Sequence, residues 1–249
     1  MLAEQAGRLL DERAHPDALR KLIDAGAEWD EGLWREVAAM GFLGATIPEE
    51  YGGLGMGRSD LAVLSEVLGR KAGSLPFFSS AVLATEAILL AGSEEQKAEY
   101  LPKLASGELI GAFAYAEGDH AEIAKQSVAF DGGRLSGSKY PVADAGIAEL
   151  YIVIAEDKGE PVMTLVDAKA AGITKTKLES FDELRAHYRL DFDDTPAELM
   201  SNDAAVALDT LFDRATVQSA FEAVGGSDAC ISMARDYALD RKIFGRSLA

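Results

Sequence analysis

The chain has 249 residues, of which 48% are hydrophobic and 27% are charged, and its formal net charge is −18. This is the composition of an ordinary globular protein, long enough for one large domain or for two to three small ones. The acidity and the lack of a long Lys/Arg run argue against nucleic acid and against anionic membrane surfaces as partners.

The cysteine and histidine content limits which disulfides and metal sites the chain can form. Cys230 is the single cysteine, so no disulfide framework can form, and we expect a reduced, cytoplasmic setting. This cysteine falls within an apolar stretch, which predicts a core position. The three histidines lie far apart in the sequence, so we expect no metal site.

The first part of the chain reads as short amphipathic helices, because apolar residues recur at three- and four-residue spacing. Ser93 and Gln96 have the spacing of a capping box at the start of the last of these helices. Pro48 and a run of glycines make residues 42–57 a loop. Residues 1–109 are therefore predicted to form an all-α domain. The expected helices cover residues 2–13, 16–25, 31–40, 61–72, 80–91 and 94–105.

The sequence changes character near residue 110, where short segments rich in β-branched and aromatic residues begin. Asp131-Gly132-Gly133 and Asp157-Lys158-Gly159 supply hairpin turns between them. In the last segment Tyr188 falls on the apolar face, whereas His187 falls on the polar face and is expected at the surface. Residues 110–199 are therefore predicted to form a β-barrel or β-sandwich domain. The expected strands cover residues 111–115, 127–130, 150–155, 162–166 and 185–191.

The last part of the chain is dominated by one helical pattern. Residues 203–245 contain no proline and keep helical spacing, which predicts a helix of about 55–60 Å. Gly225-Gly226 in its middle lowers the helix propensity, and such a pair usually lets another backbone approach closely. Arg241, Lys242 and Arg246 place cations at the expected helix end, where they complement the helix dipole. The fold class expected for the chain is therefore α+β.

Several motifs follow one another in a fixed order along the chain. They are Trp34 with Gly41-Phe42-Leu43-Gly44, Pro48-Glu49-Glu50-Tyr51-Gly52-Gly53, Gly92-Ser93-Glu94-Glu95-Gln96-Lys97, Leu135-Ser136-Gly137-Ser138-Lys139 and Arg241-Lys242-Ile243-Phe244-Gly245. In this order and spacing the chain is similar to the flavin-dependent acyl-coenzyme A dehydrogenases over essentially all of its length. Members of that family have an N-terminal helical domain, a β middle domain and a C-terminal four-helix domain that begins with one long helix. The resemblance implies that residues 200–249 are the first long helix of a C-terminal bundle that is incomplete here.

The resemblance also implies an activity, a cofactor and partners. Members of the family desaturate an acyl-CoA thioester between its α and β carbons, with a glutamate as the base and FAD as the hydride acceptor. Electrons then pass to an electron-transfer flavoprotein. The Leu75-Pro76-Phe77 segment is similar to a compact bacterial branch that acts on bulky acyl groups in lipid or steroid catabolism. Proteins of this branch form homo- or hetero-oligomers, and a dimer of dimers is implied for this chain.

The same resemblance points to residues that would contact FAD. Two strand ends would meet the flavin ring, and the basic end of the long helix would reach FAD bound mainly to a neighbouring subunit. A guanidinium suits pyrophosphate there, because it offers charge-assisted donors in a fork. The implied cofactor-binding residues are Phe113, Tyr115 and Ala116 on the first strand end, Pro141, Val142 and Ala143 on the second, and Arg241 and Phe244.

This sequence departs from the family pattern at three places. Ala116 stands where many relatives have a threonine whose hydroxyl donates a hydrogen bond to the flavin. Shortly after it, this chain has Asp119-His120 where those relatives have Gly-Ser-Asp. Pro141 and Ala143 stand where relatives have an aromatic residue and a Thr or Ser. The catalytic glutamate is expected outside this chain, because the position that holds it in a minority of relatives is Ala215. Asp213, two residues away, lies nearly opposite on the helix and is a poor substitute.

These departures leave several alternatives open. The chain is either a fragment of a longer polypeptide or a subunit that does not carry the base. It is either an FAD-dependent enzyme subunit or a non-catalytic structural subunit whose own flavin site has decayed, while Arg241 and Phe244 serve a partner's FAD. A third alternative is an acyl-CoA-binding protein without redox chemistry.

Overall fold

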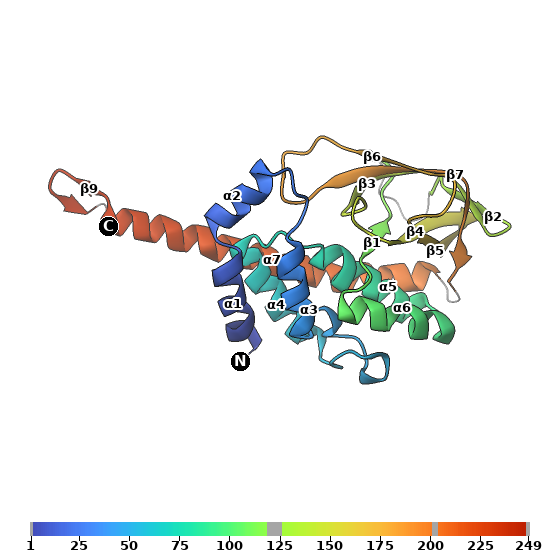
Figure 1. The fold of residues 1–249 in the computed structure, drawn as a ribbon, viewed down its shortest axis with the longest axis horizontal. Coiled ribbons are helices and arrows are strands. Elements are labelled where there is room, and N and C mark those ends of the chain that lie inside the picture. Colours follow the sequence, from blue (N-terminus) through green and yellow to red (C-terminus); the bar gives the residue numbers. More distant parts are fainter. Residues whose placement is uncertain (1, 119–125, 201–203, 248–249) are drawn as a thin grey trace.

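The computed structural model describes residues 2–118, 126–200 and 204–247. Helices come first, a curled sheet follows, and one long helix runs below the sheet and alongside the N-terminal helices before it projects beyond them (Figure 1). The α+β fold class predicted from the sequence is confirmed. Asp119 and His120 lie outside the described residues.

The predicted helices are present, with ends shifted by up to three residues. Ser93 and Gln96 form the predicted capping box: the Gln96 N–H donates to Ser93 Oγ at 3.2 Å, and the Ser93 N–H donates to Gln96 Oε1 at 2.9 Å. One helix begins earlier than expected, as a π-helix whose wide turns are of a kind often found near functional sites. The helices are α1 (Leu2–Arg13), α2 (Pro16–Asp24), α3 (Glu31–Ala39), α4 (Arg58–Lys71), the π-helix η3 (Phe77–Ala84), α5 (Thr85–Ala91) and α6 (Glu94–Ser106).

The middle of the chain forms one curled sheet, in the strand order β6-β7-β3-β2-β4-β5-β8 with β1 paired in parallel to β4. Both predicted hairpin turns are present, because Gly132, Gly133, Lys158 and Gly159 take the positive φ that tight turns require. The residue pattern did not predict β3, β6 or β8, and only the end of β3 was named, by family resemblance. The strands are β1 (Gly111–Ala114), β2 (Ala129–Asp131), β3 (Arg134–Ala143), β4 (Leu150–Asp157), β5 (Glu160–Asp167), β6 (Ile173–Lys177), β7 (His187–Pro196) and β8 (Glu198–Leu199).

The long helix α7 (Ala204–Asp240) crosses α4 at glycines of both helices. A Cβ on Gly225 would lie 1.9 Å from the Glu66 carbonyl oxygen, and a Cβ on Gly69 would lie 1.9 Å from that of Glu222. The predicted close approach of a backbone at Gly225 is therefore confirmed. Its partner Gly69 was not foreseen.

Polar contacts fix the register of this crossing. The buried Glu86 carboxylate of α5 pairs with Arg58 of α4 at 2.7 Å and also with Arg214 of α7. The Gln218 amide of α7 donates to the Arg58 carbonyl oxygen at 3.2 Å, and its oxygen accepts from the Ser65 hydroxyl at 3.1 Å. One buried carboxylate and one buried amide thus hold α4, α5 and α7 together.

The prediction that the helix continues to Gly245 is wrong. The helix ends at Asp240, and Lys242–Ile243 (β9) pairs with Arg246–Ser247 (β10) in a small hairpin. Its two turn residues, Phe244 and Gly245, have φ values of 53° and 79°, which suit a tight hairpin turn and not a helix. The basic cluster therefore belongs to a hairpin and does not cap the helix.

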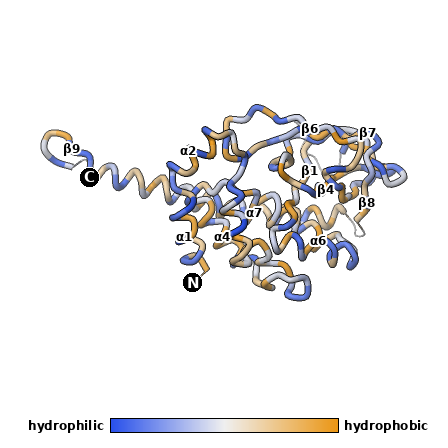
Figure 2. Tube along the Cα trace, viewed as in Figure 1, coloured by the Kyte–Doolittle hydropathy of each residue, from blue (hydrophilic) through white to orange (hydrophobic). Residues whose placement is uncertain are grey.

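The outer half of α7 stands away from the body of the chain, and apolar stretches continue along it (Figure 2). Ile231, Met233 and Tyr237 are each more than 60% exposed there. Cys230 is also exposed, so its predicted core position is wrong, because the part of α7 that carries it has no layer packed over it. None of the described helices combines the length and hydropathy that a membrane span requires.

Candidate functional site

A cavity of about 300 Å³ lies where the ends of β1 and β3 meet η3 and α7. Its walls are mostly aromatic or aliphatic, and two basic side chains stand among them. This combination of apolar walls with few polar groups is typical of a site for an organic ligand. The lining residues are Phe78, Ser79 and Leu83 of η3, Phe113, Tyr115 and Ala116 of the β1 end, Pro141 and Ala143 of β3, Arg185, His187 and Phe212.

The cavity brings together most of the residues that the sequence singled out. Five of the six predicted positions on the two strand ends line it. The sixth, Val142, is fully buried and is not part of the lining, because neighbouring side chains on a strand point to opposite faces. The two strand ends are held side by side by backbone hydrogen bonds: the Tyr140 N–H donates to the Ala116 carbonyl oxygen and the Gly118 N–H to that of Tyr140, each at 2.8 Å.

Phe212 was not predicted as a site residue. Its ring packs edge-on against Tyr115, with centroids 4.8 Å apart, and against Phe113, with centroids 6.1 Å apart. Burial raises the pKa of Tyr115, so this phenol stays neutral over the physiological range. An aromatic residue at helical spacing ordinarily indicates core, and no sequence signal separated Phe212 from its apolar neighbours.

His187, expected at the surface, is partly exposed and also lines the cavity. It is the register partner of Ala143, so the two side chains share one face of the sheet. The alternation in β7 correctly separated His187 from Tyr188, but the polar face of this strand borders the cavity at this point.

A buried ion pair lies directly behind the β1 end. Lys139 is fully buried, and its Nζ donates to Glu117 Oε1 at 2.6 Å and to the Tyr115 carbonyl oxygen at 3.2 Å. Burial lowers the pKa of Lys139 to about 8, against the opposing effect of the Glu117 carboxylate. Burial also opposes the charge on Glu117, but hydrogen bonds from Lys139 and Ser127 lower the pKa of Glu117 below its ordinary value. The pair thus fixes the backbone that carries Tyr115 and Ala116.

A second buried carboxyl lies beside the cavity. Asp144 follows β3 in a left-handed backbone conformation, accepts a hydrogen bond from the Ser79 hydroxyl, and donates its N–H to the Ala186 carbonyl oxygen at 2.9 Å. Burial raises the pKa of Asp144, although Ser79, Arg185 and His187 favour its charged form. Asp144 therefore ties η3 to the segment before β7 rather than facing the cavity itself.

Arg241 and Phe244 lie far from this cavity, on the hairpin at the outer end of α7 (Figure 1). Both are exposed, Phe244 completely. They are thus placed away from the other predicted site residues of the same chain.

The described residues that line the cavity include no carboxylate. Ala215 is buried and has no acid–base group, and Asp213 is exposed and does not line the cavity. The rings of Phe113, Tyr115 and Phe212 line the cavity together with the small residues Ala116 and Ala143, and mostly apolar, aromatic walls of this kind suit a planar aromatic ring system such as isoalloxazine. A ring of this kind fits the residues that are present.

Comparisons with known proteins identify relatives of this chain in sequence and in fold. Residues 1–108 match the family model for the acyl-CoA dehydrogenase N-terminal domain. A probable acyl-CoA dehydrogenase of Bacillus subtilis is 34% identical over 145 residues, which cover 55% of this chain and 24% of that protein. The human mitochondrial very long-chain specific acyl-CoA dehydrogenase is 31% identical over 192 residues, or 72% of this chain and 27% of that protein. The match thus spans about a quarter of the length of these two curated relatives.

Solved structures extend the likeness over the whole chain. A steroid ACAD variant is 31% identical with a TM-score of 0.90, covering 99% of this chain and 68% of that one. The ChsE4–ChsE5 complex from Mycobacterium tuberculosis is 25% identical with a TM-score of 0.90, covering 99% and 68%. An acyl-CoA dehydrogenase complexed with FAD from Bacillus anthracis shares the fold at 24% identity and a TM-score of 0.89, covering 100% and 45%. From its sequence, its fold and these relatives, the chain belongs to the acyl-CoA dehydrogenase family.

Proposed function

We propose that the chain is a subunit of an FAD-dependent acyl-CoA dehydrogenase that desaturates an acyl-CoA thioester between its α and β carbons. The observation that carries this proposal is the cavity in which the β1 and β3 ends meet Phe212 of α7. Two strand ends named by family resemblance, far apart in sequence, form one lined space there. A relative of the same fold from Bacillus anthracis holds FAD.

In this proposal the chain's own residues bind the flavin ring and enclose the reacting carbons of the thioester. Phe113, Tyr115 and Phe212 provide aromatic walls that hold a flat ring and keep water away from the reacting carbons. Lys139 and Glu117 hold the β1 end in place from behind. When bound, FAD supplies a hydride acceptor for the β carbon of the thioester. The base that removes the α proton is not among the described residues of the cavity.

We also propose three domains, an oligomeric assembly and a cytoplasmic setting for this chain. We assign residues 1–109, 110–199 and 200–249 to an N-terminal α domain, a middle β domain and the first helix of a C-terminal α domain. Arg241 and Phe244, carried outward on their hairpin, would contact FAD in a neighbouring subunit of a homo- or hetero-oligomer. The acceptor of the electrons would be an electron-transfer flavoprotein. The setting would be cytoplasmic, in lipid or steroid catabolism.

A second candidate is a non-catalytic structural subunit of a heteromeric acyl-CoA dehydrogenase. Ala116, Pro141 and Ala143 favour it, because all three line the cavity and none offers a side-chain hydrogen bond to a flavin. Such a subunit would keep the fold and lend Arg241 to the FAD of its partner.

Counting FAD in the purified assembly decides between the two. The chain is co-expressed with its natural partner, and released flavin is quantified against the protein concentration of each subunit. One FAD per chain of either kind supports the enzyme proposal, whereas one FAD per pair of chains supports the structural subunit. An assembly without flavin absorbance overturns both.

A further inference from the structure

The charged side chains around the candidate flavin cavity are unevenly placed. Arg185 and His187 line it, and no carboxylate stands among the described residues of its wall. An arginine is always positively charged, and a histidine is either neutral or positive. Burial raises the pKa of the Tyr115 phenol, which therefore stays neutral. The described part of the wall thus carries net positive charge, in a chain whose formal net charge is −18.

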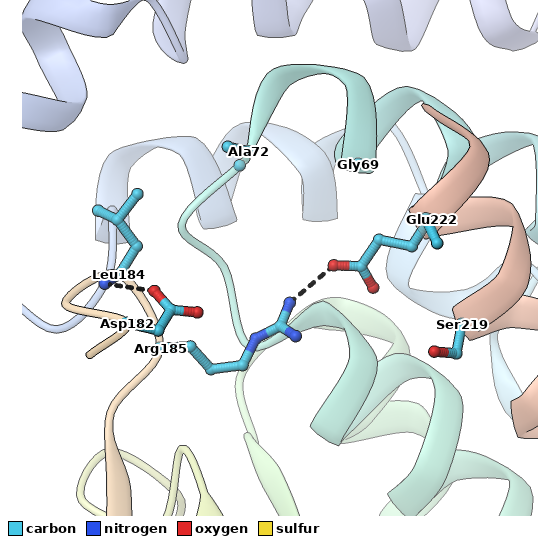
Figure 3. Close-up of a pocket in the computed structure, with 9 residues that line it drawn as sticks. Gly69, Ala72, Asp182, Leu184, Arg185, Ser219 and Glu222 are labelled. Carbon is cyan, nitrogen blue, oxygen red and sulfur yellow. Dashed lines mark hydrogen bonds and ion pairs between the residues drawn. The ribbon is translucent and has the colours of Figure 1, made fainter. Parts of the chain in front are cut away.

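The counter-ion of Arg185 lies outside this cavity. Arg185 reaches from the segment before β7 to Glu222 of α7, and its guanidinium donates to Glu222 Oε1 at 2.8 Å (Figure 3). Glu222 lines a different cavity, between α4 and α7, and does not line the candidate flavin cavity. Burial works against the charge on Arg185, but the Glu222 carboxylate outweighs it and raises the pKa of Arg185. The ion pair therefore contributes its positive partner, and not its negative one, to the wall of the flavin cavity.

The buried carboxyl of Asp144, beside the cavity, is already engaged. It accepts a hydrogen bond from the Ser79 hydroxyl, and it does not line the cavity, whereas Ser79 does. Burial raises the pKa of Asp144, while the Ser79 hydroxyl, the Arg185 guanidinium and His187 favour its charged form. The charge of Arg185 thus acts on a carboxyl that is bonded to a residue of the cavity wall, so it also acts on whatever that wall encloses.

Hydride transfer in the proposed reaction brings negative charge into this cavity. The oxidised isoalloxazine ring is neutral, and a hydride carries one negative charge, while the α proton of the thioester leaves to the base and not to the ring. The same two electrons oxidise the thioester and reduce the ring, which is then an anion. A positive wall attracts the anion more than the neutral ring, and so favours the reduced form. This attraction acts at a distance and needs no particular ring atom to face Arg185.

We propose that Arg185 stabilises the reduced, anionic form of the flavin bound by this chain and thereby raises its two-electron reduction potential. The inference rests on the proposed FAD-dependent function and adds the residue that tunes the cofactor. Arg185 acts through its charge and takes up neither the hydride nor the α proton. Glu222 moderates the effect, because its carboxylate partly cancels the field of the guanidinium.

The reduction potential of the flavin in the purified assembly tests the proposal, measured by spectroelectrochemical titration without acyl-CoA. Arg185→Met should weaken the preference for reduced over oxidised flavin about tenfold, which lowers a two-electron potential by about 30 mV. Glu222→Gln removes the counter-charge and should raise the potential. Arg185→Lys keeps the charge and should stay close to the parent protein. Arg134→Met, at an exposed arginine 3.1 Å from Asp194, is the control and should leave the potential unchanged.

Opposite shifts in Arg185→Met and Glu222→Gln separate an effect of charge from an effect of packing, because a loosened cavity would move both potentials the same way. If this chain holds flavin but neither substitution moves its potential, or both move it in the same direction, the role of Arg185 is wrong and the FAD-dependent function stands. If this chain holds no flavin, the FAD-dependent function is itself wrong and the inference fails with it.

Discussion

Gly225 of α7 and Glu66 of α4 meet so closely that a methyl group on the glycine would overlap the glutamate's carbonyl oxygen, at 1.9 Å. The backbones of the two helices are thus in direct contact. We expect Gly225→Ala to force them apart and to lower the free energy of unfolding by about 1–3 kcal/mol, the usual cost of overpacking. Chemical denaturation of the variant and the parent protein measures the difference.

Gly226 is the matched control for this substitution. A Cβ there would lie 3.5 Å from the Gly69 carbonyl oxygen, an ordinary contact. Gly226→Ala should therefore be neutral or stabilising by up to about 1 kcal/mol, because alanine favours the helix. Equal effects of the two substitutions would show that propensity, and not the helix crossing, sets the result.

Lys139 provides a second prediction. Replacing it with methionine removes the cation paired with the largely buried Glu117 carboxylate and leaves, among the described residues, the bonds from Ser127 and Val128. We expect a loss of about 3–5 kcal/mol in the free energy of unfolding, as for other broken buried pairs. Lys103→Met, at a half-exposed lysine 3.7 Å from Glu99, should change it by less than about 1 kcal/mol.

The double variant Lys139→Met with Glu117→Gln sharpens this test. If the cost of the single change comes from an unpaired carboxylate, neutralising that carboxylate should recover part of the stability. No recovery would assign the loss to packing of the lysine stem instead.

The contribution of Glu117 to the free energy of unfolding should depend on pH. Its folded pKa lies below the ordinary value of 4.5, so its carboxylate stabilises the fold above that pH. The contribution is lost as the pH falls through the folded pKa, because the proton then binds the folded state as well. The free energy of unfolding should therefore differ most between the parent protein and Glu117→Gln near neutral pH, and the difference should shrink in acid. A difference that stays constant into acid would contradict the assigned pKa direction.

Replacing Arg241 should weaken the retention of FAD in the assembled protein. If its guanidinium binds the pyrophosphate of FAD in a neighbouring subunit, Arg241→Met should weaken FAD retention by the assembly about tenfold or more. Fluorescence of flavin released on dilution measures this loss. Arg246→Met, at an exposed arginine of the same hairpin, is the control and should retain FAD.

The sequence predicted the parts of the fold that depend on local chemistry. Ser93 and Gln96 have the spacing of a capping box, and Gly132 and Gly159 mark tight hairpin turns, so both features could be read without knowing the partners. The hairpin at Phe244 could not be read in this way. Its apolar spacing continues that of α7, and a phenylalanine is a poor indicator of positive φ.

The candidate site was predictable only where family resemblance named its residues. The ends of β1 and β3 were found in this way, whereas His187 and Phe212 were not. Alternation assigned His187 to the polar face of β7, but which layer covers that face is a tertiary fact. Lys139 stood inside a recognised motif, yet nothing local showed that it would be fully buried against Glu117.

The projecting half of α7 has a thermodynamic consequence. From Ile231 to Asp240 most side chains are exposed, so this stretch gains little from packing within its own chain. An isolated helical segment of this length is marginal in water. If neighbouring polypeptide in an assembly covers this stretch, the packing stabilises its helical state, and its order is then linked to assembly by mass action. In that case the helicity and the melting temperature of this protein should rise with protein concentration.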